Sequence, residues 1–120
     1  MRSKDGEIMA DEARVAYERA VDLYGQGKAQ EATGALLALI EKIPDFYDAY
    51  ETLGMILYKQ GRLDEAITWT QKLATLRPDY PMAHTNLSVF YMKKGMKEKA
   101  EEEKAQAMVI NIQNAGKIKK

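Results

Sequence analysis

The sequence has no cysteine and only one histidine among its 120 residues. Without cysteine there are no disulfides, no thiolate metal ligands and no cysteine nucleophile. A zinc site is disfavoured as well, because a single histidine has no second histidine or cysteine with which to share a metal. There is also no glycine-rich phosphate loop and no Ser/His/Asp set. The composition therefore predicts a protein that is not an enzyme and holds no metal or other cofactor.

An excess of charge and a long apolar segment are also lacking. The 18 basic and 18 acidic side chains give a formal net charge of zero, so the overall charge does not favour nucleic acid or an anionic membrane. The longest apolar run, ALLALI at 35–40, is far shorter than the roughly 20 residues of a membrane span. The N-terminus lacks the continuous apolar stretch of a secretion signal. We expect a cytoplasmic single domain, 1–120, that binds neither nucleic acid nor membranes.

What the sequence does contain is a spaced pair of small residues. In KQGRLDEAITW, 59–69, a glycine is followed five positions later by an alanine. The pair occurs three times at intervals of 34 residues, as Gly27 with Ala32, Gly61 with Ala66, and Gly95 with Ala100. A fixed period of this length is typical of repeat architectures. It divides the chain into repeats 13–46, 47–80 and 81–114, and leaves 115–120 as a basic tail that we expect to be frayed.

Each repeat reads as two antiparallel helices, because its apolar residues recur at helical spacing. The glycine favours the left-handed conformation that ends the first helix, and the small alanine lets the second helix approach closely. Pro44 and Pro78 end the second helices, and Asp45 and Asp79 are expected to cap the helices that follow. Pro81 suits a first turn. The predicted helices lie near 10–25, 30–43, 46–60, 64–77, 80–94 and 97–113.

The middle repeat resembles a known family. The stretch AYETLGMILYKQGRLDEAITWTQKLATLRPD, 49–79, is similar to a tetratricopeptide repeat through Tyr50, Leu53, Gly54, Gly61, Ala66 and Pro78. The third repeat matches through Leu87, Tyr91, Gly95, Ala100 and Ala107, and the first through Ala20, Gly27, Ala32 and Pro44. The resemblance implies an all-α, right-handed solenoid of three helix-turn-helix repeats, about six helices in all. It also implies a concave groove that binds another protein or a peptide segment.

In this family the first helix of each pair lines the groove, through positions spaced 3, 4 and 3 apart. Here those positions hold Arg14, Tyr17, Val21, Tyr24, Asp48, Glu51, Met55, Tyr58, Met82, Thr85, Val89 and Met92, with Lys59 and Lys93 at the edge. Methionine adapts to irregular apolar partners and tyrosine adds a hydrogen-bonding tip, so the lining suits a peptide with aliphatic anchors. The alternative is that some of these side chains, Tyr24 and Tyr58 above all, pack against neighbouring helices.

The best-known ligands of the family are the acidic C-terminal tails of heat-shock chaperones, which are held by lysine, asparagine and arginine. The matching positions here are Tyr17, Val21, Thr52, Met82 and Asn86. Only Asn86, which we also count among the predicted groove residues, has a side-chain amide. None of the five is a cation, so a desolvated carboxylate would have no charged partner. We therefore expect an apolar or mixed-charge ligand, with a basic residue that meets Asp48 and Glu51.

The third repeat changes where a fourth would pack against it. Ile67 corresponds to Glu101, and Leu36 corresponds to Lys104. Polar replacement of this kind suits a solvated end of the array. The alternative is an exposed apolar patch, Met108, Val109, Ile110 and Ile112, that meets a second copy. We expect a monomer or a weak homo-oligomer, and a packing role for His84 and for Trp69.

Overall fold

The computed structural model describes the backbone of residues 4–118 and the side chains of residues 10–117. The described backbone consists of six α-helices without strands: α1 Lys4–Gly25, α2 Ala29–Lys42, α3 Tyr47–Lys59, α4 Leu63–Leu76, α5 Pro81–Lys93 and α6 Lys97–Ile118. Helices α2 to α5 begin and end within one residue of the predicted bounds. Helix α1 begins six residues before position 10, and α6 continues five residues past position 113. Residues 115–118 are therefore helical where a frayed tail was predicted, and 119–120 lie outside the described residues.

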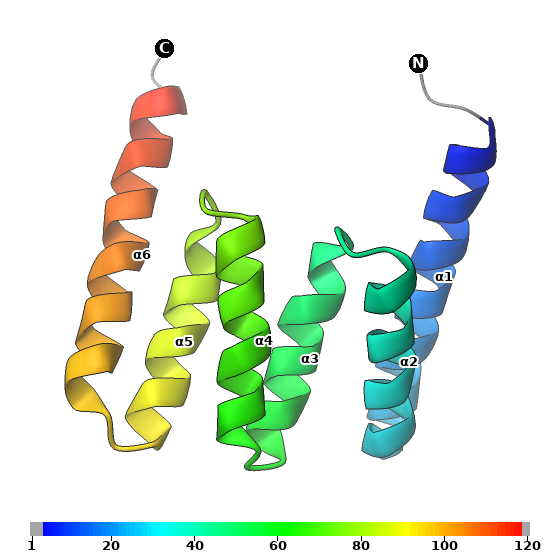
Figure 1. Ribbon diagram of the computed structural model, residues 1–120, viewed down its shortest axis with the longest axis horizontal. Helices are drawn as coiled ribbons and strands as arrows, with labels where there is room; N and C mark the ends of the chain where they lie inside the picture. Colours follow the sequence, from blue (N-terminus) through cyan, green and yellow to red (C-terminus); the bar gives the residue numbers. More distant parts are fainter. Residues whose placement is uncertain (1–3, 119–120) are drawn as a thin grey trace.

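The helices follow one another in a curved row, with α1 and α2 at one end and α6 at the other (Figure 1). Each helix packs against the next in the chain, and the row measures 43 × 42 × 20 Å along its principal axes. The architecture is a right-handed α-solenoid of three helix pairs, as predicted. None of the helices within residues 4–118 is both long enough and apolar enough to cross a lipid bilayer.

The three turns inside the helix pairs share one geometry. Gly27, Gly61 and Gly95 have φ values of 82°, 77° and 79°, in the left-handed region that glycine adopts without a steric penalty. The residue after each glycine donates a backbone hydrogen bond of 2.9 Å back across the turn. The alanines five positions after these glycines are buried. The predicted reasons for both small residues are confirmed.

The predicted caps at Asp45 and Asp79 are wrong. The N-cap positions of α3 and α5 are held by Phe46 and Tyr80, and neither helix has a side-chain cap. Each aspartate lies one residue too early to reach the free N–H groups of the first turn. Asp79 instead lies beside Arg77, with 3.7 Å between Oδ1 and Nε. Pro81 does begin α5, as predicted.

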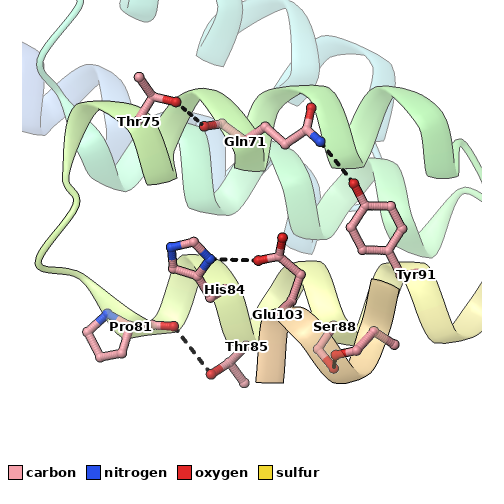
Figure 2. Close-up of polar contacts among 9 residues, drawn as sticks. Gln71, Thr75, Pro81, His84, Thr85, Ser88, Tyr91 and Glu103 are labelled. Atoms are coloured by element: carbon pink, nitrogen blue, oxygen red, sulfur yellow. Dashed lines mark hydrogen bonds and ion pairs between the residues drawn. The ribbon is translucent and has the colours of Figure 1, made fainter. Parts of the chain in front are cut away.

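One contact between the two helices of a pair is built differently in successive repeats. In the middle repeat the rings of Tyr50 and Trp69 lie 6.0 Å apart, which agrees with the packing role predicted for Trp69. Thirty-four residues later the same two positions hold His84 and Glu103. The ring of His84 faces the carboxylate of Glu103 (Figure 2), with 2.6 Å between Nδ1 and Oε2. Both side chains are mostly buried. A polar pair thus replaces an aromatic pair, and His84 joins α5 to α6.

Candidate protein-interaction surface

Helices α1, α3 and α5 form one face of the solenoid, which we call the first-helix face. Its first hollow has a volume of about 360 Å³ and lies between α1 and α3. It is lined by Tyr17, Tyr24, Asp48, Glu51, Thr52, Met55, Ile56 and Lys59. Six of these eight were predicted groove residues, so the predicted positions do converge here. Ile56 and Thr52 were not among them.

Polar contacts hold the two walls of the first hollow together. The hydroxyls of Tyr17 and Thr52 are hydrogen-bonded at 2.7 Å, and Arg14 Nη1 lies 3.2 Å from Asp48 Oδ2. The Arg14 guanidinium also covers the ring of Phe46 at 5.0 Å from its centroid. The Arg14 and Asp48 side chains are about half exposed, so this ion pair adds little to stability and Asp48 keeps free acceptor sites.

Tyr80 reaches from the turn before α5 to the groove residue Glu51. Its hydroxyl donates to both oxygens of the Glu51 carboxylate, at 2.9 Å to Oε2. Burial, and then the hydrogen bond to Glu51, raise the pKa of Tyr80 to about 12. The sequence did not point to this contact, because the two residues are 29 positions apart and lie on different elements.

This contact predicts a loss of stability in alkali. The pKa of Tyr80 is raised above its unfolded value near 10, so the stabilisation is complete below pH 10 and is lost as pH rises towards 12. Below pH 10 we expect the wild type to exceed Tyr80→Phe by about 1 kcal/mol in unfolding free energy. Denaturant titrations from pH 8 to 12 should show this difference shrinking. Every other ionisable group is common to the two proteins, so a difference independent of pH would contradict the prediction.

The second hollow is larger, at about 550 Å³, and lies at the other end of the first-helix face. Its lining residues are Tyr58, Thr85, Ser88, Val89, Met92, Lys93, Glu101 and Lys104. Val89 and Met92 are 45% and 50% exposed. The ring of Tyr58 stacks on Phe90 at a centroid distance of 4.9 Å. Tyr58 therefore packs against a neighbouring helix and also lines a hollow.

Not every predicted groove residue lines these hollows. Four lie outside both: Arg14, Val21, Met82 and Asn86. Val21 and Met82 are nevertheless exposed on the same face. The prediction omitted Ser88, Glu101 and Lys104, although the replacement of Ile67 by Glu101 signalled a change of surface at this end.

The predicted patch on α6 is only partly exposed. Met108, Val109 and Ile112 are 59%, 44% and 66% exposed, whereas Ile110 is 2% exposed and belongs to the core. The expectation that Ile110 remains exposed is wrong. Ile110 lies on the buried stripe of α6 with Ala107 and Ala100, at spacings of three and ten residues, and this stripe packs against α5.

Residues 10–117 contain no group of three or more histidine, cysteine, aspartate or glutamate side chains arranged to hold a metal ion.

The fold and the two hollows define an α-helical repeat protein with a hollowed, partly apolar face. A model of the tetratricopeptide repeat matches residues 17–81, which is more than half of the chain. The chain belongs to the tetratricopeptide repeat family. A comparison with curated proteins gives no match.

Solved structures share the fold. The crystal structure of MamA has a TM-score of 0.81 at 24% sequence identity, over 87% of this chain and 61% of the MamA chain. The Yersinia enterocolitica type III secretion translocator chaperone SycD has a TM-score of 0.78 at 22% identity, over 83% of this chain and 76% of SycD. A chain of the CopN–Scc3 complex gives 0.79 at 20% identity, with 89% and 63% covered. These likenesses concern the fold, and this chain spans less than two thirds of the MamA chain.

Proposed function

We propose that this chain is a non-enzymatic interaction module that binds a segment of a partner protein along its first-helix face. The observation that carries the proposal is the pair of open hollows on that face, flanked by apolar side chains left exposed. Val21, Met82, Val89 and Met92 are each at least 41% exposed. Exposed apolar groups gathered around a hollow are typical of protein-binding surfaces. The similarity to a translocator chaperone and to a chain of a protein complex supports the same class of function.

The lining indicates a ligand of mixed chemistry. Met55 supplies an adaptable apolar wall, while Asp48 and Glu51 place two carboxylates at the edge of the first hollow. A ligand with an aliphatic anchor for Met55 and a lysine or arginine for the carboxylates satisfies both. The positions that would hold an acidic chaperone tail carry no cation, so we do not propose an adaptor of that kind. The cytoplasmic location remains a prediction.

The proposal predicts that a charge in the first hollow abolishes partner binding without unfolding the chain. Met55→Lys places an ammonium group in an apolar wall, and we expect at least a tenfold loss of partner recovered in affinity purification from the native host. Val15→Lys is the matched control, because Val15 is an exposed valine of α1 that does not line either hollow. Equal recovery with wild type and Met55→Lys would contradict the proposal.

Self-association through α6 is the second candidate function, and the exposure of Met108, Val109 and Ile112 favours it. Light scattering at several concentrations separates the two. A change of Ile112 to aspartate tests this surface cleanly, because its side chain is exposed, whereas a change of Ile110 would disturb the core. Assembly that depends on Ile112 and persists in Met55→Lys would favour the second function, and a monomer at all concentrations would remove it.

A further inference from the structure

Inside the solenoid, one helix pair provides a surface on which a side chain of the next pair packs. Phe90 of α5 is 1% exposed and lies against Gly54 and Tyr58 of α3. We call these two residues, together with Thr70 beside Gly54, the Phe90-binding surface. The Cε2 atom of Phe90 would lie 3.8 Å from a Cβ built at Gly54, and the Phe90 ring stacks on Tyr58. A helix is thus held by a bulky apolar side chain pressed onto the preceding pair.

The same surface exists again at the end of the row. Thirty-four residues after Gly54, Tyr58 and Thr70 come Ser88, Met92 and Lys104. All three line the second hollow. Within residues 4–118 no helix follows α6, so nothing in the described chain covers this copy of the surface (Figure 1). The second hollow therefore has the position and the backbone geometry of a helix-binding surface.

Ser88 replaces Gly54 and Met92 replaces Tyr58 in this copy, but the largest chemical difference is in charge. Ile67, which is buried in the middle repeat, is replaced by Glu101, and the buried Thr70 is replaced by Lys104. Lys93 also lines the hollow, so two ammonium groups face one carboxylate. Val89 and Met92 keep an apolar floor. A helix with one bulky apolar side chain and an excess of carboxylates matches this surface in shape and in charge.

We propose that the second hollow binds an acidic amphipathic helix of a partner protein, in the place that a further repeat would take. One large apolar side chain of this helix lies on Ser88 and Met92, and a carboxylate pairs with Lys93 or Lys104. The inference deepens the proposed function, since it rests on the first-helix face being an interaction surface and names the partner for one end of it.

The test uses the chain's own α3 as a probe. A synthetic peptide of residues 45–61 carries Ile56 at the position equivalent to Phe90, and has three carboxylates and one lysine. Fluorescence anisotropy with the full chain should show saturable binding. A second peptide, lactam-bridged on its solvent face, removes much of the cost of forming an isolated 17-residue helix. We expect tighter binding of the bridged peptide and at least fivefold weaker binding of an Ile56→Ala peptide.

Matched variants of the chain locate the site. Val89 of α5 and Val15 of α1 are exposed valines, at 45% and 55%, but only Val89 lines a hollow. Val89→Glu should weaken peptide binding at least tenfold, and Val15→Glu less than twofold. Lys104→Glu should weaken it at least threefold, since it reverses one of the two positive charges. Circular dichroism checks that the variants remain folded.

The inference is overturned if neither peptide shows saturable binding, or if Val15→Glu weakens binding as much as Val89→Glu. A Lys104→Glu variant with unchanged affinity would also overturn it, because the charge match would then play no part. Dimers that form with increasing concentration and are abolished by Val89→Glu would show that a second copy of the chain covers this surface. The proposal of a partner helix would then be wrong. Native partners that are lost with Met55→Lys and retained with Val89→Glu would leave the proposed function intact while removing this inference.

Discussion

Replacing Phe90 with alanine is expected to lower the free energy of unfolding by about 3–5 kcal/mol. The side chain is 1% exposed, and its ring lies against α3 while its backbone belongs to α5. Truncation removes the transfer free energy of the ring and leaves a cavity between two repeats. Because each repeat of a solenoid contacts only its neighbours, this junction is what couples α5 and α6 to the rest of the row. Chemical denaturation followed by circular dichroism measures the loss.

The chain's other phenylalanine provides the control. Phe46 lies in the turn before α3, only half-buried, so Phe46→Ala should cost about 1–2 kcal/mol. We also expect the Phe90→Ala transition to broaden, with a smaller dependence on denaturant, since weakened coupling lets the last pair unfold separately. A loss below 2 kcal/mol, or one no larger than that of Phe46→Ala, would show that Phe90 does not hold this junction.

The second large effect on stability is expected from adding a single methyl group at Gly54. A Cβ there would lie 2.7 Å from Thr70 Oγ1, closer than unstrained atoms approach. Thr70 cannot easily turn away, because its hydroxyl is buried and donates a hydrogen bond of 2.8 Å to the carbonyl oxygen of Ala66. We expect Gly54→Ala to destabilise the chain by about 1–3 kcal/mol, measured by denaturant titration, although alanine is the better helix former.

Two further variants isolate the cause. Gly34 also lies inside a helix, but a Cβ there meets nothing within 4 Å, so Gly34→Ala should stabilise the chain by up to about 1 kcal/mol. In a Thr70→Ala background the clash disappears, and Gly54→Ala should then be neutral or stabilising. A double-mutant cycle without coupling between positions 54 and 70 would contradict this explanation.

The helices and their turns were predictable because their causes are local. Gly61, for example, ends a helix through the conformation of its own backbone, since only glycine adopts the left-handed conformation without strain. The same residues at a fixed interval then predicted that one unit is repeated. The predicted caps at Asp45 and Asp79 failed for a local reason as well, because a shift of one residue removes a carboxylate from the first turn.

The surface was predictable only in part. Helical spacing placed Tyr17 and Met55 on one face, and the structure brings both to the first hollow. Spacing did not separate Ile112 from Ile110 on α6, because apolar residues lie on more than one side of this helix. Ile112 is exposed and Ile110 is buried because of the orientation in which α6 packs against α5.

By itself the sequence determined the unit: two helices, a glycine turn, a small residue for close approach, and three copies of them. The tertiary structure alone decided which faces those copies bury and which they leave open. It joined Tyr80 to Glu51, His84 to Glu103 and Phe90 to Gly54, across separations of 19 to 36 residues. Such contacts depend on the rotation and distance between packed helices, which are set by the whole row and not by any single stretch of chain.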